Sequence, residues 1–372
     1  MNARHLLPAP VQMTLFVAFP CNLRCKNCWL FGIADTPRDY MGTPDKDIMS
    51  WETFRAAVDP LFGHGAVPSI CFMGGEPMLH ARIVDMIRHI KEQGPAYVDM
   101  NTNGTRLDKL GREMVKAGID ALYVSLDGST PEINDASRGI GSFERAVHGI
   151  EAVRDLRDEG MPVKVAINYT VTCENYRDLE RLGDLARRLA VDELFVNLSV
   201  FVTPEEGAAA QRTLHEELGM RFDSWRGFMI GPIIEGIDSQ ELVAQLGALR
   251  HNAGDVPTFV QPVGYSAEEL GHYFTPQWKD VVREKACPVQ TFRTTVLPNG
   301  DVVPCTLYPD VVVGNLRRTS LMEVWHGEEY ARFRALVEDR LLPTCHRCCD
   351  LFDETKGDPA AFVTNSRLQY RL

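Results

Sequence analysis

Three cysteines, Cys21, Cys25 and Cys28, lie within eight residues of one another, directly after an apolar segment that predicts a strand. Three thiols this close in sequence point to one metal centre. Three thiolates would leave one iron of a cubane iron–sulfur cluster without a protein ligand, and an open coordination site is where a bound molecule can react. Zinc is the alternative, but structural zinc takes four ligands, and no fourth Cys or His lies nearby.

A second group of thiols lies near the end of the chain. It consists of Cys287, Cys305, Cys345, Cys348 and Cys349. Four of them suffice for one cubane cluster. We expect Cys349 to be the spare thiol, with replacement of Cys348 or service to a more reduced or damaged cluster as the alternatives. Separated cysteine pairs also fit tetrahedral zinc, which is therefore the alternative here too. The other cysteines, Cys71 and Cys173, stand alone in the sequence, and we expect both to be small buried side chains.

Composition disfavours several classes of protein. The net charge of −12 argues against a nucleic-acid partner, because phosphate binding favours a basic surface. No apolar run approaches the length of a membrane span, and the first twelve residues lack the core of a signal peptide. We therefore expect a soluble, cytoplasmic protein, in which ten cysteines indicate metal or redox chemistry rather than disulfides.

Short apolar runs alternate with amphipathic stretches over the first half of the chain. The predicted strands are Met13–Phe19, Ser69–Met73, Tyr97–Asn101, Ala121–Leu126, Val163–Val171 and Glu193–Phe201. The predicted helices are Ser50–Phe62, Ala81–Gln93, Leu107–Ala117, Phe143–Glu159 and Tyr176–Leu189, with N-caps at Ser50 and Ser142. Such repeats indicate an α/β fold with parallel strands joined by right-handed crossovers.

Several of these strands have one apolar and one polar face. Asn168 and Thr170 share one face of the fifth strand, and Asn197 and Ser199 share one face of the sixth. Strands of a fully packed barrel are apolar on both faces. Polar faces on successive strands therefore predict a barrel with an open interior that holds a polar ligand.

The strand–helix alternation ends near residue 201, and we divide the chain into four parts. Residues 1–201 form the predicted barrel. Residues 202–286 form a bridging region that we expect to cover the substrate, with helices at Pro204–Leu218, Ser239–Arg250 and Ser266–Tyr273. Residues 287–349 form a compact cysteine-bearing domain, and residues 350–372 form a C-terminal tail.

The pattern Cys21-x3-Cys25-x2-Cys28 resembles the hallmark of radical S-adenosylmethionine (SAM) enzymes, and Gly74-Gly75-Glu76 resembles that family's Gly-Gly-Glu motif. The resemblance implies a partial (β/α)6 barrel and a [4Fe-4S] cluster that binds SAM and cleaves it to a 5′-deoxyadenosyl radical. It also implies that Gly74, Gly75 and Glu76 hold the methionine ammonium of SAM. An external donor such as flavodoxin or ferredoxin would supply the electron.

Polar residues at the ends of the predicted strands are candidates for further SAM contacts. They are Asn101, Asn103, Ser125, Asp127 and Asn168. In similar enzymes such segments contact the ribose and carboxylate of SAM, and Arg138 is a candidate for a bidentate pair with that carboxylate. Turn chemistry also explains the Asn-Gly and Asp-Gly pairs, so both interpretations stay open. Asn27 departs from the family, which carries an aromatic residue next to adenine there; Trp29 and Phe31 are candidate substitutes.

The C-terminal domain resembles the SPASM domain, or its shorter twitch form, which binds auxiliary iron–sulfur clusters. The shared order is Cys287, Gly300-x4-Cys305, Gly314-Asn315, Ser320-Leu321 with Trp325, and Cys345-x2-Cys348. A full two-cluster SPASM domain needs about seven cysteines, so we expect one auxiliary [4Fe-4S] cluster. Its ligands would be Cys287, Cys305, Cys345 and Cys348.

Two clusters favour a net oxidation, because a substrate radical can pass a second electron to the auxiliary cluster. We expect dehydrogenation of a small molecule such as a sugar or aminocyclitol in natural-product biosynthesis, and the cysteine spacing resembles a twitch-type dehydrogenase of aminoglycoside biosynthesis. A peptide-modifying enzyme (crosslinking, epimerisation or formylglycine-type oxidation) is one alternative, which the start of the first strand near Met13 disfavours because it leaves no room for a leader-binding domain. A non-catalytic iron–sulfur or zinc protein is another. Candidates for handling a substrate proton are Tyr40, His80, Tyr169 and Arg138.

Overall fold

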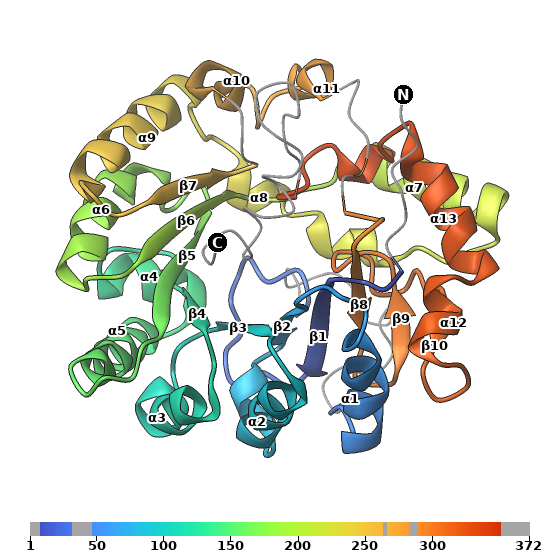
Figure 1. Cartoon of the computed structure of the whole chain (residues 1–372). Coiled ribbons are helices and arrows are strands. Elements are labelled where there is room, and N and C mark those ends of the chain that lie inside the picture. Colours follow the sequence, from blue (N-terminus) through green and yellow to red (C-terminus); the bar gives the residue numbers. More distant parts are fainter. Residues whose placement is uncertain (1–7, 32–46, 263–265, 283–286, 288, 351–372) are drawn as a thin grey trace.

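The computed structural model describes residues 8–31, 47–262, 266–282, 287 and 289–350. Within these residues the strands form one sheet of ten strands, in the order β10-β9-β8-β1-β2-β3-β4-β5-β6-β7. The sheet curls around a central space, and most helices lie on its outside (Figure 1). Tyr40 and the predicted tail beyond residue 350 lie outside the described residues.

The first six strands are the predicted ones. They are β1 (Gln12–Ala18), β2 (Ser69–Gly74), β3 (Tyr97–Thr102), β4 (Ala121–Ser125), β5 (Lys164–Val171) and β6 (Glu193–Leu198). Each pairs with the next in a parallel arrangement. The predicted α/β fold, built on a partial (β/α)6 barrel, is confirmed.

The helices that connect these strands cover the outer face of the sheet (Figure 1). They are α1 (Trp51–Val58), α2 (Ile83–Gln93), α3 (Leu107–Ala117), α5 (Ser142–Arg154) and α6 (Leu179–Arg188). A further helix after β4, α4 (Pro131–Arg138), is not among the predicted ones. Ser50 caps α1 as predicted, because its side chain accepts a hydrogen bond from the Thr53 N–H. The predicted cap at Ser142 is wrong, because the chain enters α5 through Gly141 at φ +74°.

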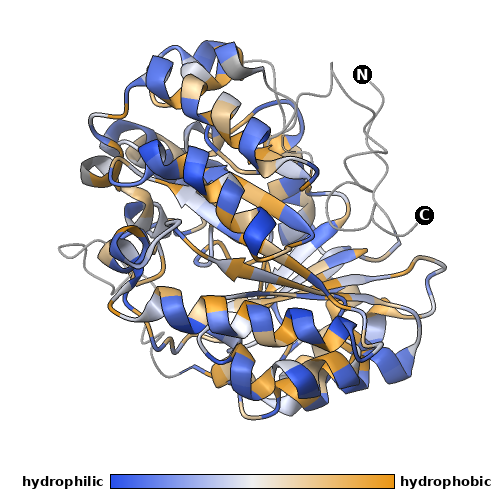
Figure 2. Cartoon of the chain, turned by 90° about the vertical axis from the view of Figure 1, so that its left-hand side faces the viewer, coloured by the Kyte–Doolittle hydropathy of each residue, from blue (hydrophilic) through white to orange (hydrophobic). Residues whose placement is uncertain are grey.

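The strands of the barrel divide into an apolar outer face and a more polar inner face, as predicted. Leu122 and Val124 of β4 and Val165 and Ile167 of β5 belong to the core that packs against the helices. The helices carry hydrophobic and hydrophilic residues on different sides, as expected of a layer packed on one face (Figure 2). Since the apolar core lies outside the sheet, the polar groups of the inner face are left for a ligand.

The bridging region continues the barrel. Its strand β7 (Thr258–Gln261) pairs in parallel with β6, and its helix α9 (Ser239–Ala253) packs against α6. Four residues give too little alternation for β7 to be recognised in the sequence. The other elements of the region are α7 (Pro204–Leu218), the 3-10 helix η7 (Ser224–Phe228), α8 (Gly231–Ile234), α10 (Ala267–Gly271) and α11 (Trp278–Val281).

The C-terminal domain is joined to the barrel through its first strand. β8 (Arg293–Val296) pairs in parallel with β1, and β9 (Asp301–Val303) and β10 (Gly314–Asn315) follow in antiparallel order. β8 and β9 form a hairpin, with Gly300 at φ +88° in its turn. Helices α12 (Leu321–Trp325) and α13 (Glu328–Glu338) complete the domain. The shared sheet fixes the second group of cysteines relative to the barrel.

Candidate active site

The first three cysteines lie on the loop of residues 20–29, which follows β1 and is called the cysteine loop below. Its entry packs closely against the end of β2. A Cβ atom at Gly74 would lie 2.1 Å from the Ala18 carbonyl oxygen, and one at Gly75 would lie 2.0 Å from that of Phe19. Only glycine permits this approach, so the Gly-Gly pair and the cysteine loop form one unit.

The thiols of the cysteine loop need a positive centre to ionise. Burial raises the pKa of all three, that of Cys25 to about 11. Charge on Cys28 raises the pKa of Cys21 and Cys25 further, because like charges oppose each other. A bound metal deprotonates its coordinating thiols, so this donor set fits an iron–sulfur cluster with one open iron.

The described residues do not gather the predicted ligands as tightly as a closed zinc site would. Tetrahedral zinc with Zn–S bonds of about 2.3 Å holds its sulfurs about 3.8 Å apart. Among the described residues, one group of three potential ligand atoms lies wholly within 4.8 Å, namely Cys348, Cys349 and Asp350. Neither the loop thiols nor any three of the four predicted auxiliary ligands are gathered that closely.

Glu76 is completely buried and joins the ends of β2 and β3. Its carboxylate accepts hydrogen bonds from the Met78 N–H (3.0 Å), the Thr102 hydroxyl (2.8 Å) and the Asn103 N–H (2.8 Å). A carboxylate has about four acceptor positions, so one remains for a further donor such as the SAM ammonium. The contact of Gly74, Gly75 and Glu76 with SAM stays a prediction.

Asp127 ties the cysteine loop to the barrel. Its buried carboxylate accepts hydrogen bonds from the Asn27 amide (3.0 Å) and the Thr170 N–H (2.9 Å), and pairs with Arg138 Nε (2.7 Å). Arg138 also places Nη1 4.0 Å from the Cys25 Sγ. We interpret Asp127 as a positioning residue, since these partners occupy its carboxylate. Asn27 is the residue through which the cysteine loop is held to Asp127. The contact of Arg138 with the SAM carboxylate stays a prediction.

The remaining predicted SAM contacts are arranged in two ways. Asn103 donates to Asn22 of the cysteine loop (2.9 Å), so it braces that loop. Ser125 pairs with Asn168 in the β4–β5 ladder and lies outside the cavity described below, whereas Asn101 and Asn168 line it. Direct contacts of these residues with SAM stay predictions.

Two residues predicted to handle a substrate proton are used elsewhere in the fold. His80 binds the Met49 carbonyl through Nε2 (2.9 Å) and accepts from the Arg82 N–H at Nδ1 (3.1 Å). The Tyr169 hydroxyl is buried on the outer face of β5, where it donates to the Asn175 carbonyl (2.8 Å). Neither lines the cavity, and both predictions are corrected: side-chain direction, which spacing does not reveal, removes them from the mouth.

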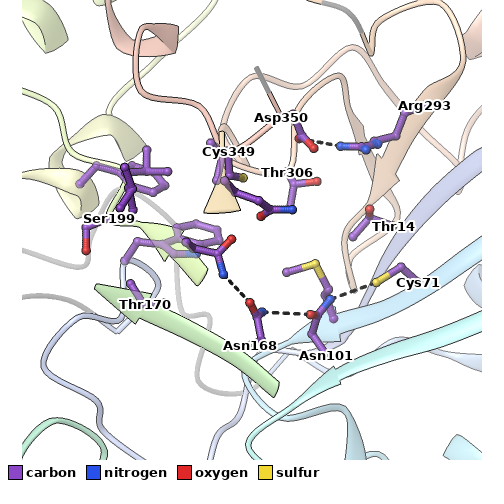
Figure 3. Close-up of a pocket in the computed structure, with 18 of the residues that line it drawn as sticks. Thr14, Cys71, Asn101, Asn168, Thr170, Ser199, Arg293, Thr306, Cys349 and Asp350 are labelled. Carbon is purple, nitrogen blue, oxygen red and sulfur yellow. Dashed lines mark hydrogen bonds and ion pairs between the residues drawn. The ribbon is translucent and has the colours of Figure 1, made fainter. Parts of the chain in front are cut away.

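A cavity of about 300 Å³ lies at the barrel mouth (Figure 3). Its lining comes from the inner faces of the strands, the cysteine loop, the bridging region and the C-terminal domain. Asn27 and Trp29 represent the cysteine loop, and Cys349 and Asp350 represent the C-terminal domain. Neighbours of both cysteine sites therefore line the cavity, whereas the seven predicted cluster ligands do not.

A row of three carboxamides crosses the cavity from β6 to β2. Asn197 donates to Asn168, Asn168 donates to Asn101 (3.5 Å), and Asn101 donates to the Cys71 Sγ (3.2 Å; Figure 3). Cys71 is buried as predicted, whereas Cys173 is only half-buried. Because a carboxamide both donates and accepts hydrogen bonds, the row suits a ligand rich in hydroxyl or amino groups.

An aromatic pair forms the apolar wall of the cavity. Trp29 stacks on Phe228 of η7, with ring centroids 5.3 Å apart and planes inclined by 13°. Of the two predicted substitutes for the missing aromatic residue, Trp29 lines the cavity, while Phe31 is buried in an apolar cluster. A contact between Trp29 and adenine stays a prediction.

The described lining of the cavity contains two charged side chains, which pair with each other. Arg293 Nη1 lies 2.6 Å from Asp350 Oδ2, and Arg293 Nε donates to the Gln12 side chain (3.0 Å). Asp350 follows Cys348 and Cys349 in the chain, so the pair lies beside the second cysteine site (Figure 3).

The second cysteine site is buried in the C-terminal domain. Burial raises the pKa of Cys287, Cys305 and Cys345, the last to about 12, and a hydrogen bond with Cys349 raises that of Cys348. Charge on Cys345 also raises the pKa of Cys305, because like charges oppose each other. As in the cysteine loop, this donor set fits a metal cluster that supplies the positive charge.

Two family models match the chain in the order that the motifs predict. The model of the radical SAM superfamily matches residues 18–186, and that of the SPASM iron–sulfur cluster-binding domain matches residues 287–349. The chain is therefore a radical SAM enzyme with a C-terminal SPASM domain. The two domains imply SAM and two [4Fe-4S] clusters as cofactors.

Several known proteins are similar to this one over most of its chain. The tungsten-containing aldehyde ferredoxin oxidoreductase cofactor-modifying protein of Pyrococcus furiosus is 26% identical over 91% of this chain and 88% of its own. An AdoMet-dependent heme synthase of Nitratidesulfovibrio vulgaris is 26% identical over 86% and 79%. SuiB of Streptococcus suis bound to SAM has a similar fold, with a TM-score of 0.60 at 17% identity over 89% of this chain and 69% of its own. SuiB is also known bound to the precursor peptide SuiA.

Several residues of the site are not predicted from the sequence. They are Gln12, Phe228, Gln290, Arg293, Tyr308 and Asp350. Each reaches the site from a different element, so no spacing pattern marks them as a group. No helix in the described part of the chain is long and apolar enough to cross a membrane.

Proposed function

We propose that this enzyme oxidises a small polar molecule by two electrons, as in the dehydrogenation of a secondary alcohol of a sugar or aminocyclitol. The observation that carries the proposal is the shared cavity. Asn27 and Trp29 line it from the cysteine loop, and Cys349 and Asp350 line it beside the auxiliary ligand Cys348. A molecule in this cavity would contact residues that neighbour both predicted cluster sites.

The chain's own residues bind and orient the substrate. When bound, the cofactors supply a 5′-deoxyadenosyl radical that takes a substrate hydrogen atom and a cluster that takes the remaining electron, while the hydroxyl proton leaves to solvent. The carboxamides of Asn101, Asn168 and Asn197 offer donors and acceptors to substrate hydroxyl groups. The stacked rings of Trp29 and Phe228 exclude water from one side.

The size and charge of the cavity favour a small molecule. About 300 Å³ is room for one compact ligand, and the charged side chains of the described lining neutralise each other as an Arg293–Asp350 pair. A single residue of a peptide would also fit such a volume. Peptide modification is therefore the outcome that the test must separate from oxidation of a small molecule.

The test is incubation of the anaerobically reconstituted enzyme with SAM, a reductant and a panel of deuterated sugars, aminocyclitols and short peptides. The proposal expects deuterium in 5′-deoxyadenosine and a small-molecule product that lacks two hydrogens. A product of unchanged oxidation state, or turnover of the peptides alone, would contradict it. Flavodoxin or ferredoxin as the electron donor remains a prediction, tested by replacing the chemical reductant with either protein.

A further inference from the structure

A buried tyrosine points its hydroxyl group at one sulfur of the second cysteine site. Tyr308 Oη lies 3.2 Å from the Cys345 Sγ and 2.6 Å from the Thr344 Oγ1. The ring is fixed by Phe222 of the bridging region, whose centroid lies 4.5 Å away. Tyr308 is 3% exposed, so water does not compete for its hydroxyl group.

The direction of these hydrogen bonds depends on the state of Cys345. A thiol can donate to Tyr308, which then donates to Thr344. A thiolate in a cluster has no proton, so Tyr308 must donate to the sulfur and accept from the Thr344 hydroxyl in return. The two hydroxyl groups therefore turn toward the sulfur when the ligand is ionised.

A second buried side chain donates to another sulfur of the same site. Gln290 Nε2 lies 3.0 Å from the Pro304 carbonyl oxygen and 3.6 Å from the Cys287 Sγ. The carbonyl fixes the orientation of the amide, because only its nitrogen can donate there. The second N–H of the same nitrogen is left for the sulfur, and Gln290 is 4% exposed.

Both of these side-chain donors are neutral. A neutral donor lowers the energy of a thiolate without adding a counter-charge, and it does so more strongly in a buried setting. A reduced cluster carries one more negative charge than an oxidised one, so hydrogen bonds to its sulfurs favour the reduced state. Asp350, whose backbone N–H lies 3.3 Å from the Cys348 Sγ, adds a further such contact.

We propose that Tyr308, supported by Thr344, and Gln290 raise the reduction potential of the auxiliary cluster and so favour its role as an electron acceptor. This inference rests on the proposed function only where it says why a higher potential is useful. The hydrogen bonds themselves act on the cluster whatever the substrate is. Tyr308, Thr344 and Gln290 are positioning residues, because they act through Cys345 and Cys287 rather than on a substrate.

The test measures the midpoint potential of the auxiliary cluster by spectroelectrochemical titration. The full chain carries Cys21→Ala, Cys25→Ala and Cys28→Ala, so that one cluster of about four irons remains. In this background Tyr308→Phe and Gln290→Leu should each lower the potential, and Thr344→Val should lower it by less. Tyr330→Phe is the matched control, because Tyr330 is a buried tyrosine of the same domain whose hydroxyl donates to the Arg293 carbonyl (3.0 Å).

An unchanged potential in Tyr308→Phe with about four irons retained would overturn the inference, as would an equal shift in Tyr330→Phe. If Tyr308→Phe does not retain iron, the test relies on Gln290→Leu and Thr344→Val. Unchanged midpoint potentials in both of these variants would overturn the inference. The titration uses no substrate. Unchanged potentials therefore contradict this inference alone, whereas a product of unchanged oxidation state contradicts the proposed function alone.

Discussion

The cysteine loop takes three thiols from eight consecutive residues, whereas the four predicted auxiliary ligands are spread over residues 287–348. The first site is braced by a charged pair, Asp127 and Arg138, and the second by the neutral donors Tyr308 and Gln290. The first leaves an open coordination position, and the second has thiols enough to close its cluster. The difference suits the division of work in the proposed function, in which one site binds and activates SAM and the other accepts an electron.

The largest expected effect comes from removing the first site. Replacing Cys21, Cys25 and Cys28 together by Ala should abolish SAM cleavage and lower the iron content from about eight to about four per chain. Iron analysis and chromatography of 5′-deoxyadenosine measure both. Cys173→Ala serves as the control, since Cys173 lies in neither group. Retained cleavage in the triple variant would refute the role of the cysteine loop.

Removing the second site should separate the two halves of the reaction. Cys345→Ala should lower iron to about four per chain, keep SAM cleavage and lose the oxidised product. The product is absent because the substrate radical has no acceptor beside the cavity. Mass spectrometry of the product and metal analysis test this. One zinc and about four irons in the unmutated protein would show that the second site is a zinc site.

The charged brace of the cysteine loop should matter for stability. Asp127→Ala leaves the buried guanidinium of Arg138 without its partner and should lower the free energy of unfolding by about 3 kcal/mol. Glu159→Ala is the control: it removes an equally short ion pair with Arg112, but at the exposed surface. Denaturant titration of both variants measures the difference. Equal effects would mean that burial of the Asp127 pair is unimportant.

A smaller loss of stability is expected on replacing Gly314 of the SPASM domain. A Cβ atom at Gly314 would lie 2.5 Å from the Val324 Cγ2, so Gly314→Ala should cost about 1–3 kcal/mol through overpacking. Gly231→Ala is the matched control, because nothing lies within 4 Å of its added Cβ. Thermal denaturation tests the pair. A larger loss in Gly231→Ala would contradict the packing argument.

Much of the fold follows from local pattern. The six barrel strands and the helix Leu107–Ala117 are predicted closely, because hydrophobic alternation is a property of neighbouring residues. Strand β7 and helix α4 are missed, since β7 is short and α4 follows a turn without a strong apolar repeat. His80 and Tyr169 are mistaken for mouth residues, because spacing along the chain does not give the direction of a side chain.

The sequence by itself determines the chemistry of this protein: three thiols on one loop, a Gly-Gly-Glu turn and four later thiols define a radical SAM enzyme with an auxiliary cluster. The sequence can show this because the three predicted ligands of the first site lie within eight residues of one another. Only the tertiary structure decides what surrounds them. The cavity lined by neighbours of both sites, the Asp127–Arg138 brace and the donors of Tyr308 and Gln290 come from residues far apart in the chain. Packing of the shared sheet brings these residues together, and no local pattern records it.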